Sequence, residues 1–434
     1  MRRAMFRFAA ALCCGALLFA AGCASAAAGE GARLEESPAL VDRVRIVAPA
    51  DGATVPLLKD GHKEFLDSDR AARRKVFADD DYRRAMRKVG DAPAKVALEW
   101  RGGQGPWHVV VKREADGKVF FSGDSEKPKL DLENLEIARK YTWIVSESGK
   151  TAAKASFMTE DRAPRMIHVA GVPNMRDIGG RIGLDGRRVR QGLVYRSAGL
   201  NENANRYYTK DEILKMHEKG ILVESVPELS KKDAQKIEER LKPGSKKKPD
   251  LKHLVKEWRP GKKRLGSQSK AYLVETLGIK TDIDLRTDRE CYGMKGSPVG
   301  DAVKWVHVSS SAYSDMASAE GKEAFAKVFR TFLDEKNYPI VFHCIAGADR
   351  TGSLAYILNA LLGVGEDELE KDWEVTAFEN KNIVHSRIDA LLAVFAKYPG
   401  ATPMERVEAY VKELGFTDAD IARFRAIMLE APAK

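Results

Sequence analysis

Cysteine is scarce in this chain: its 434 residues contain five cysteines, too few for a disulfide framework. Cys13, Cys14 and Cys23 lie in the N-terminal segment, so only Cys291 and Cys344 belong to the part that is expected to fold. A hydrophobic core, rather than cross-links, must therefore stabilise the fold. Cys291 is expected to be a small buried hydrophobic residue, and the alternative is a reversible disulfide with Cys344 in an oxidising compartment.

Long apolar runs are also absent, apart from one near the N-terminus. Residues 8–21 form an apolar stretch behind a basic start, and this stretch is too short to span a membrane comfortably. Ala20-Ala21-Gly22-Cys23 then resembles a bacterial lipoprotein signal, with cleavage before Cys23 and a lipid on its sulfur; the alternative is ordinary cleavage after Ala26. Residues 1–26 therefore predict an export signal. The mature chain is expected in the bacterial cell envelope, as a membrane-anchored lipoprotein or as a periplasmic protein.

No cluster of histidines and carboxylates has the spacing of a metal site, so neither a metal nor another cofactor is expected. The net charge is +10, and two basic runs lie at Lys246–Lys248 and Arg259–Arg264. We interpret these runs as solvated loop surface; the alternative is a basic collar that attracts anionic substrates or anionic lipid. Aromatic residues accompany the basic ones only at Tyr207-Tyr208 and Trp258, so no nucleic-acid partner is expected.

Residues 38–160 have the pattern of an all-β domain, in which short β-branched and apolar runs alternate with turn signals. The expected strands are 41–47, 95–100, 107–113, 118–122, 129–132, 141–147 and 153–159. Several short strands around Trp100, Trp107 and Trp143 predict a β-sandwich of the fibronectin-III or immunoglobulin type. A charged segment at about 61–92 interrupts the pattern and is expected to be a helical insertion.

The sequence from residue 165 to residue 434 changes character after a linker at 161–164. Strand and helix patterns alternate there, which predicts an α/β domain with a mainly parallel sheet flanked by helices. Helices are expected at 366–378, 385–398 and 421–430. A basic insertion at about 201–265 is expected to interrupt this domain, with helical pieces at 211–219 and 230–241.

The segment from His343 to Ser353 is the most informative in the chain. It follows Ile340–Phe342, which is expected to end a buried strand, and it precedes residues 354–362, which are expected to form a buried helix. Backbone N–H groups in a tight loop, backed by a helix N-terminus, bind an oxyanion. A cysteine at the strand end and an arginine at the helix start would complete a phosphate cradle around a sulfur nucleophile.

Each residue type in this segment suits that chemistry. The positive field of the loop favours a thiolate, so the pKa of Cys344 is expected to lie below the value of about 8.5 for a free cysteine. The side chain of Arg350, six positions later, can bind two phosphate oxygens bidentately. Thr351 can donate its hydroxyl to the sulfur, and a glycine in the loop lets the backbone turn close to the ligand. The phosphate-binding backbone would comprise Ile345, Ala346, Gly347, Ala348, Asp349 and Arg350.

The run His343-Cys344, five residues, then Arg350-Thr351-Gly352 resembles the signature loop of cysteine-dependent protein tyrosine phosphatases. Asp349, directly before the arginine, resembles the bacterial tyrosine/lipid phosphatase branch of that family. Further segments resemble motifs of this branch and occur in the same order: Asn174–Gly180, Val194–Ser197 and Gly278–Arg286. The resemblance covers the chain from about Arg165 to the C-terminus, interrupted by the insertion.

This resemblance implies a phosphocysteine mechanism that needs no metal. Cys344 would be the nucleophile, supported by His343, and an aspartic acid would protonate the leaving group. The branch points to Asp284 as this acid; the alternative is that Asp284 fixes Arg286 or a loop N–H. Asp315, in the polar segment after the strand 305–308, is a rival. Asp349 is a third candidate, which is expected to pair with a nearby base or to assist the attack of water.

Ala348 stands where lipid-active members of the branch often carry a lysine, which favours phosphotyrosine over phosphoinositides as the substrate. We therefore predict an exported tyrosine phosphatase that acts on phosphorylated protein or on similar phosphomonoesters. The alternatives are a phosphoinositide or inositol-phosphate phosphatase with the same mechanism, and a non-catalytic module that only binds phosphate. An inert buried thiol and a rhodanese-type sulfurtransferase are disfavoured, because neither needs this combination of residues. Arg176 and Asp177 are expected to brace the fold near the site.

Overall fold

The computed structural model describes residues 43–202, 204–226, 229, 231–242, 245, 254–380 and 383–432. The predicted export signal at 1–26, with the expected lipid site Cys23, and the basic run Lys246–Lys248 lie outside these residues. By its contacts the chain divides into two units, 1–42 and 43–434, and all elements described below belong to the second. Within the described ranges, the helices are too short or too polar to cross a membrane.

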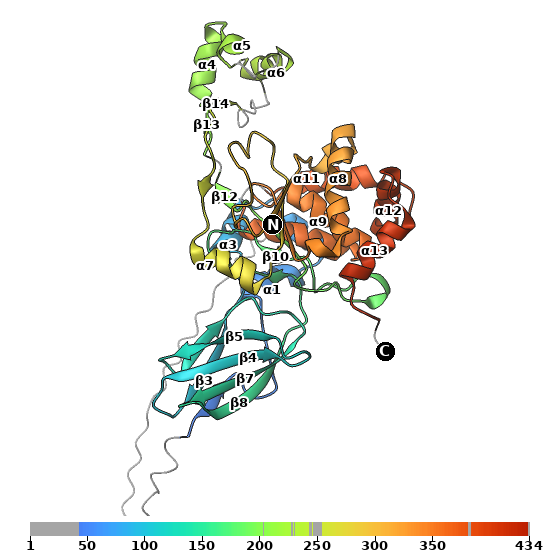
Figure 1. Cartoon of the computed structure of the whole chain (residues 1–434). Coiled ribbons are helices and arrows are strands. Elements are labelled where there is room, and N and C mark those ends of the chain that lie inside the picture. The colour runs from blue at the N-terminus through green and yellow to red at the C-terminus, as the bar shows by residue number, and fades with distance from the viewer. Residues whose placement is uncertain are drawn as a thin grey trace, which may run out of the picture. The chain divides into compact units, whose positions relative to one another are not determined.

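Two sheets make up a β-rich region between residues 45 and 159 (Figure 1). One sheet consists of β1 (Arg45–Ala48), β3 (Val96–Arg101) and β6 (Lys129–Leu132). The other has the order β2-β8-β7-β4-β5 and consists of β2 (Ala53–Val55), β4 (Trp107–Arg113), β5 (Val119–Ser125), β7 (Lys140–Glu147) and β8 (Lys150–Thr159). Residues of both sheets share one hydrophobic cluster, which contains Trp100, Trp107 and Trp143. The predicted β-rich region is confirmed, whereas its fibronectin-III or immunoglobulin type stays a prediction.

Three helices occupy the charged segment between β2 and β3: α1 (Asp60–Asp67), α2 (Arg70–Val76) and α3 (Asp80–Val89). The side chains of Asp69 and Asp79 cap α2 and α3 by accepting N–H groups of the first turn. The large apolar side chains of these helices do not join the core of the β-rich region. Phe65, Leu66, Phe77 and Met86 belong instead to the hydrophobic core of the C-terminal α/β region.

The C-terminal region is built on a six-stranded sheet with the order β17-β16-β18-β11-β10-β9. Its strands are β9 (Arg165–Met166), β10 (Arg176–Asp177), β11 (Val194–Ser197), β16 (Thr281–Asp284), β17 (Lys304–His307) and β18 (Ile340–His343). The first four strands in this order pair in parallel, and β10 and β9 are antiparallel. The sheet is therefore mixed: it has the expected parallel part and, in addition, an antiparallel edge that the sequence did not predict.

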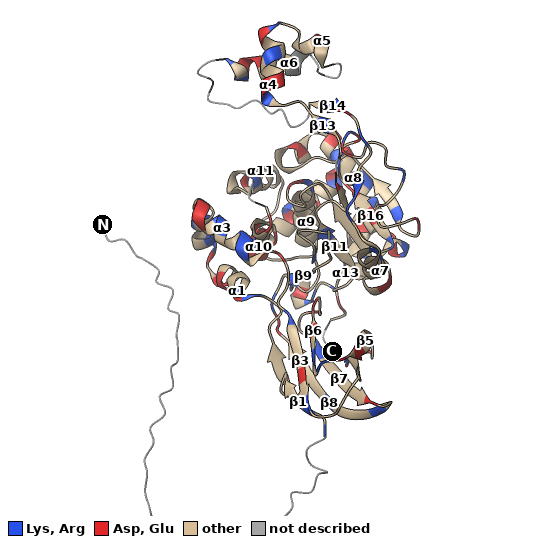
Figure 2. Ribbon diagram, turned by 90° about the vertical axis from the view of Figure 1, so that its left-hand side faces the viewer, with Lys and Arg blue, Asp and Glu red and all other residues tan. Residues whose placement is uncertain are grey.

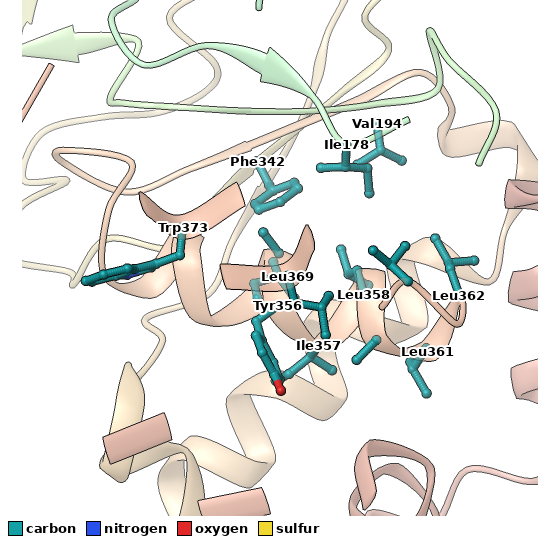
Figure 3. Packing of buried hydrophobic residues seen from close by; sticks show 14 of the residues in the cluster. Ile178, Val194, Phe342, Tyr356, Ile357, Leu358, Leu361, Leu362, Leu369 and Trp373 are labelled. Atoms are coloured by element: carbon teal, nitrogen blue, oxygen red, sulfur yellow. The ribbon is translucent and has the colours of Figure 1, made fainter. Parts of the chain in front are cut away.

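Helices cover both faces of the sheet, and the residues of its central strands β16, β18 and β11 are buried on both faces. On one face, residues such as Val194 and Phe342 share a cluster with α8 (Ala319–Phe332), α9 (Arg350–Leu361), α12 (Pro403–Glu413) and α13 (Asp418–Met428). Figure 3 shows this packing, with Val194 and Phe342 above Leu358 of α9. On the other face, Tyr195 and Val341 pack with residues of η3 (Tyr272–Thr276), which follows α7 (Ser267–Ala271).

The remaining helices complete the C-terminal half. They are η2 (Leu184–Gly186), η4 (Tyr313–Ala317), η5 (Glu335–Asn337), α10 (Glu366–Glu374), η6 (Val375–Phe378) and α11 (His385–Phe395). Capping boxes at Thr402 and Thr417 begin α12 and α13. The helices expected at 366–378, 385–398 and 421–430 are confirmed, with ends that differ by a few residues.

The basic insertion leaves the sheet after β11 and returns before α7. β12 (Asn201–Glu202) pairs with β15 (Lys262–Lys263), and β13 (Arg206–Tyr207) pairs with β14 (Val255–Glu257), so the two ends of the insertion are held together. Between them, α4 (Lys210–Glu218), α5 (Leu222–Ser225) and α6 (Lys231–Leu241) contribute to a separate hydrophobic cluster. The two predicted helical pieces correspond to α4 and α6, whereas the paired strands at the base of the insertion were not predicted.

Candidate active site

The predicted phosphate cradle lies at the carboxyl end of the parallel strands, the edge where α/β sheets commonly bind ligands. β18 ends at His343, the loop 344–349 follows, and α9 begins at Arg350. Because β18 lies between β16 and β11, the segments that follow these two strands border the same loop. Within the loop, Cys344 is buried with 1% of its surface exposed, and Ile345 beside it is 45% exposed.

Four successive carbonyl groups of the loop accept hydrogen bonds from groups outside it. His343 Nδ1 donates to Cys344 O (3.1 Å), Gly199 N to Ile345 O (2.9 Å), Asn174 Nδ2 to Ala346 O (3.0 Å) and Arg196 Nη2 to Gly347 O (2.7 Å). In a trans peptide, a carbonyl and the N–H that follows it point in opposite directions. Because these carbonyls are held outward, the N–H groups of residues 345–348 face the inside of the loop, an arrangement that binds an oxyanion.

Gly347 is required by the shape of this loop. Its φ is +67°, in the left-handed region that favours glycine. A Cβ at this position would also lie 2.6 Å from the carbonyl oxygen of Ser197. Any larger residue would therefore push the loop away from the end of β11.

The surroundings of Cys344 favour its thiolate. Burial alone would raise the pKa of the thiol, but the Arg350 guanidinium and the hydroxyl and N–H of Thr351 outweigh this effect and hold the pKa below the usual value for cysteine. The negative charge of Asp349 opposes them only in part. The sulfur is therefore prepared to act as a nucleophile or as an anionic ligand.

Glu290, which the sequence analysis did not identify, holds Arg350 in place. Arg350 Nη1 donates to Glu290 Oε2 at 2.6 Å, and Nη2 donates to Oε1 at 3.2 Å. Glu290 Oε2 also accepts the backbone N–H of Thr287 at 2.8 Å. Burial would raise the pKa of Glu290, but the charge of Arg350 keeps it below the usual value. The result is a bidentate pair that fixes the plane of the guanidinium beside the loop.

Asp284, the first candidate for the general acid, is completely buried. Its carboxylate accepts bonds from Arg286 Nε (2.8 Å), Arg286 Nη2 (2.6 Å) and Cys291 Sγ (3.3 Å). Burial would raise its pKa, but the charges of His343 and Arg286 lower the pKa well below the usual range. Asp284 is therefore ionised, and these are the contacts that its alternative role, fixing Arg286, requires.

His343 ends β18 and directly precedes the loop. It is completely buried, and its Nε2 lies 3.0 Å from Asp282 Oδ1. Burial would lower the pKa of the imidazole, but the carboxylates of Asp284 and Asp282 outweigh this effect and raise it. The protonated ring can then donate through Nδ1 to the carbonyl of Cys344, as described above.

Asp349 belongs to a second pair at the loop. Its Oδ1 accepts bonds from the Tyr313 hydroxyl (2.8 Å) and from Arg387 Nη1 (2.6 Å), and its side chain is 35% exposed. Trp373 Nε1 donates to the same tyrosine hydroxyl at 3.3 Å. The sequence predicted that Asp349 pairs with a nearby base, and Arg387 is that base. Asp315 lies two residues after Tyr313 on η4 and is exposed.

Behind the loop, Asp372 is surrounded by buried arginines. Its carboxylate accepts bonds from Arg176 Nε and Arg181 Nη2, both at 3.1 Å, and from Arg196 Nη1. Arg176 Nη1 also donates to Asn174 Oδ1 at 2.6 Å. Burial would raise the pKa of Asp372, but the arginines lower it below its usual range, while burial and the charge of Arg196 lower the pKa of Arg176 to about 9. Asp372 thus fixes the two side chains, Arg196 and Asn174, that orient the loop carbonyls.

Comparison with known proteins is consistent with this geometry. Residues 167–216 and 261–430 match the tyrosine phosphatase family, and together they make up about half of the chain. The chain belongs to the tyrosine phosphatase family. The matched ranges contain the loop 344–349, called the phosphate loop below, together with Glu290, Asp372 and the motif residues that hold the loop. Most of the basic insertion and the whole β-rich region lie outside the matched ranges.

Individual members of the tyrosine phosphatase family match shorter stretches. A Cupriavidus necator protein named as a putative tyrosine-protein phosphatase is 27% identical over 224 residues, 46% of this chain and 58% of the relative. A tyrosine-protein phosphatase of Nostoc commune is 26% identical over 121 residues, 23% of this chain and 41% of the relative. The chain therefore spans about half the length of the curated relatives that it matches.

Two solved structures show a distant likeness to the chain. The core catalytic domain of the PP-IP phosphatase Siw14 from S. cerevisiae aligns with a TM-score of 0.23 and 17% identity, over 35% of this chain and 82% of that chain. At this level the likeness supports no conclusion about the chain, and the assignment to the tyrosine phosphatase family depends on the sequence match.

Sequence reasoning missed several residues at this site, among them Glu290, Tyr313, Arg387 and Asp372. Glu290 follows Arg286 by four positions, and an acid at that spacing after the Asp-Leu-Arg motif was the available signal. Tyr313 and Arg387 carry no local signal, because η4 and α11 reach the loop only through the tertiary fold. Among the residues that the structure describes, no group of His, Cys, Asp and Glu side chains has the arrangement of a metal site.

The helical segment α1 to α3, which lies between two strands of the β-rich region, also contacts this site. Asp91, just after α3, accepts the backbone N–H of Asn174, whose side chain holds the loop. Arg73 of α2 is fully buried and donates to Glu374 Oε2 at 2.7 Å, and Glu374 Oε1 pairs with His385 at the start of α11. Figure 2 shows the charged residues of α3 and α10 in this part of the molecule. The segment that the sequence assigned to the β-rich region thus supports the phosphate loop.

Proposed function

We propose that the chain is a phosphatase that hydrolyses phosphotyrosine, or similar phosphomonoesters, through a phosphocysteine intermediate. The observation that carries this proposal is a cysteine of lowered pKa inside a loop whose N–H groups face inward. Membership of the tyrosine phosphatase family supports it. Ile345, 45% exposed directly after Cys344, offers apolar surface to an aromatic ester.

In the first step, the loop N–H groups and Arg350 bind the non-bridging oxygens of the phosphate group and stabilise their charge in the transition state. Cys344 Sγ attacks phosphorus, and the P–S bond forms as the bond from phosphorus to the ester oxygen breaks. The departing oxygen takes a proton from an acid and leaves as a phenol or an alcohol. The phosphoryl group stays on the sulfur.

We assign the proton transfer to Asp349. It is part of the loop and partly exposed, and both the Tyr313 hydroxyl and Arg387 bind its Oδ1, so that Oδ2 carries no hydrogen bond within the described part of the chain. Asp284 is disfavoured, because Arg286 engages both of its oxygens and its pKa is lowered. Asp315 on η4 is the rival.

Leaving-group dependence tests this assignment. The variants Asp349→Asn and Asp315→Asn are compared on phenyl phosphate, whose leaving group needs a proton, and on nitrophenyl phosphate, whose leaving group does not. The variant of the true acid loses activity mainly on phenyl phosphate. Equal losses of Asp349→Asn on both esters would show that Asp349 only maintains the loop.

In the second step, water attacks the phosphocysteine, and the P–S bond breaks as the new P–O bond forms. Asp349, which has given up its proton, accepts one from this water. The sulfur leaves as a thiolate, which the charge of Arg350 and the donors of Thr351 stabilise. The products are inorganic phosphate and the free enzyme.

The test of the overall proposal is hydrolysis of a phosphotyrosine peptide and of a series of inositol phosphates by the full chain in EDTA, with Cys344→Ser beside wild type. Turnover of the peptide that survives EDTA and disappears in Cys344→Ser supports the proposal. Turnover of inositol phosphates alone would move the assignment to the alternative substrate class. Absence of turnover with both, together with phosphate binding, would favour a non-catalytic module.

We also propose that the chain is exported and anchored by a lipid on Cys23, on the basis of its N-terminal sequence pattern. Expression of the full chain in a bacterium with labelled palmitate tests this. Label in the membrane fraction that is lost in Cys23→Ala supports the anchor. A soluble, unlabelled periplasmic protein would replace it with ordinary signal cleavage.

A further inference from the structure

A small basic pocket lies at the base of the insertion, between β15 and the segment that follows β16. Its volume is about 180 Å³, and its charged lining residues are Lys262, Lys263, Arg264 and Lys270. Among the described residues that line it, none is acidic. The pocket therefore has the charge and the size to hold a phosphate group.

Strand pairing, rather than a free loop, fixes the lysines at this position. Asn201 of β12 lies opposite Lys263 of β15, and Glu202 lies opposite Lys262. Gly261 approaches β12 so closely that a Cβ there would lie 2.2 Å from Asn201 Nδ2. The interpretation of the run Arg259–Arg264 as solvated loop surface is therefore incomplete: Lys262 and Lys263 are exposed, but their backbone forms the paired strand β15.

Two contacts connect the pocket with residues that border the phosphate loop. On one side, Arg264 Nη1 donates to Gly199 O at 3.4 Å, and Gly199 N donates to Ile345 O at 2.9 Å. On the other side, Met294, which lines the pocket, accepts a bond from Arg286 Nη2 at 3.2 Å through its sulfur. Arg264, which lines the pocket, is therefore linked through Gly199 to the loop that contains Cys344.

The positive charges of the pocket are poorly compensated. Glu202 is the carboxylate near Arg264, and its Oε1 lies 3.7 Å from Arg264 Nε. In the ranges that the structure describes, no carboxylate forms an ion pair with Lys262, Lys263 or Lys270. Like charges held close together repel one another, so an anion that enters the pocket would be attracted by several of them at once.

We propose that this pocket binds a second phosphoryl group of the same substrate molecule while the first lies in the Cys344 loop. The inference depends on the proposed phosphatase function and narrows its substrate class to esters that carry at least two phosphoryl groups. One group is hydrolysed, and the other anchors the molecule through the side chains of β15 and α7. Arg264 lines the pocket and also donates to Gly199 O, next to the loop that contains Cys344.

A series of ligands measures the distance between the two phosphate sites. Diol bisphosphates of increasing chain length, each beside the corresponding monophosphate, are titrated calorimetrically into the full chain carrying Cys344→Ser, which binds without turnover. We expect one chain length to bind roughly tenfold more tightly than its monophosphate, because two anionic groups then bind at once. If no bisphosphate binds more tightly than its monophosphate, the proposal is wrong.

A matched pair of variants tests whether the tighter binding of bisphosphates depends on the pocket. Gly296 lines the pocket, and a Cβ at this position would meet no atom within 4 Å, so a side chain can start there without a clash at Cβ. Gly296→Glu is expected to abolish the bisphosphate advantage by adding a negative charge, and the isosteric Gly296→Gln is expected to retain it. Lys262→Ala combined with Lys263→Ala should also remove most of it. An unchanged advantage in Gly296→Glu would place the second group elsewhere and overturn the proposal.

Two controls separate this inference from the proposed function and from a lipid ligand. Hydrolysis of phenyl phosphate should remain unchanged in these pocket variants of otherwise wild-type protein, because the cradle is intact. If wild type hydrolyses no ester at all, the phosphatase function fails, but the binding series still tests the pocket. Binding to anionic rather than neutral phospholipid vesicles that is lost in Gly296→Glu, without any bisphosphate advantage, would assign the pocket to a lipid headgroup and overturn the proposal.

Discussion

Arg350 Nη1 lies 2.6 Å from Glu290 Oε2, and the second guanidinium nitrogen lies 3.2 Å from the other oxygen of the same carboxylate. Both side chains are largely buried, so this pair, rather than solvent, decides how the guanidinium is oriented. An arginine that must bind two phosphate oxygens in a plane depends on that orientation. The carboxylate binds Nη1 and Nη2, and Nη1 also donates to Leu285 O at 3.4 Å, so Nε and the second N–H of Nη2 are left for the phosphate.

The first prediction concerns this carboxylate. Glu290→Ala should lower kcat/KM for a phosphomonoester roughly 10- to 100-fold, because Arg350 loses the partner that pre-organises it. Glu290→Gln keeps the shape and one acceptor, so it should lose less. Steady-state kinetics of the two variants check this, and thermal unfolding shows whether the fold is retained. A kcat/KM of Glu290→Ala equal to that of wild type would mean that Arg350 needs no support.

A second prediction concerns the ionisation of Cys344. The lowered pKa means that the thiolate forms at a lower pH than in a free cysteine, and only the thiolate reacts rapidly with iodoacetamide. Arg350→Ala removes the main positive charge that stabilises the thiolate, so the pH profile of inactivation by iodoacetamide should shift to higher pH. Arg350→Lys keeps the charge but not the bidentate geometry. Its alkylation profile should stay near that of wild type while its turnover falls, and a profile that shifts as far as that of Arg350→Ala would contradict this account.

The other cysteine of the described chain provides an internal comparison. Burial and the charge of Asp284 raise the pKa of Cys291, which is 5% exposed. At neutral pH, mass spectrometry after brief alkylation should therefore find an adduct on Cys344 and none on Cys291. Comparable modification of both thiols under native conditions would show that Cys291 is accessible and would revive the possibility of a disulfide between them.

The sequence predicted the phosphate loop because its chemistry is local. The strand end at Phe342, the cysteine, the glycine and the arginine follow one another within a few residues, so spacing alone reveals their relation. It also located most strands of the β-rich region, whose period-two alternation is a local signal. The supports of the loop are different. Asp372 contacts Arg176 and Arg196 across nearly two hundred residues, and no pattern within either segment indicates that contact.

The three helices α1 to α3 show the same limit of prediction from local sequence patterns. Their charged sequence correctly predicted helices, but the spacing of apolar residues along a helix does not identify the core that its apolar face joins. Phe65 and Phe77 pack into the α/β core, and arginines on the same segment pair with carboxylates of α10. Only the tertiary fold shows that a segment between two strands of the β-rich region supports the other region.

A third prediction concerns Asp372 and the pH dependence of stability. Its pKa is lowered in the folded chain, so its contribution to stability is present above the unfolded-state pKa of about 3.9 and is lost as the pH falls through the folded-state pKa. Asp372→Asn leaves the buried arginines without their counter-charge and should lower the free energy of unfolding at neutral pH by roughly 3–5 kcal/mol.

Urea unfolding of Asp372→Asn and wild type across the acid range measures both effects. The difference between the two proteins should shrink as the pH falls, because wild type loses the same interaction by protonation. A difference that stays constant down to strongly acidic pH would mean that the neutral-pH loss comes from packing rather than from charge. As a comparison, Asp81→Asn changes an exposed carboxylate of α3 and should leave stability within about 0.5 kcal/mol of wild type.

The last prediction concerns the link from the helical segment to the phosphate loop. Asp91 accepts the N–H of Asn174, a residue with φ +55° whose amide holds the carbonyl of Ala346. A non-glycine residue in this conformation needs support from its neighbours. The hydrogen bond from Asn174 N–H to Asp91 is part of that support. Asp91→Ala should therefore loosen the loop and lower kcat roughly three- to tenfold, a loss equivalent to one hydrogen bond.

The fold should tolerate this change, because the large apolar side chains of α1 to α3 still pack in the α/β core. The readout that separates loop support from general stability is inhibition by inorganic phosphate, since phosphate binds the loop directly. Asp91→Ala should weaken this inhibition by a factor similar to its loss in kcat, while Asp81→Ala on the exposed side of α3 changes neither. If Asp91→Ala lowers the melting temperature but leaves phosphate affinity and kcat intact, the helical segment stabilises the chain without shaping its catalytic loop.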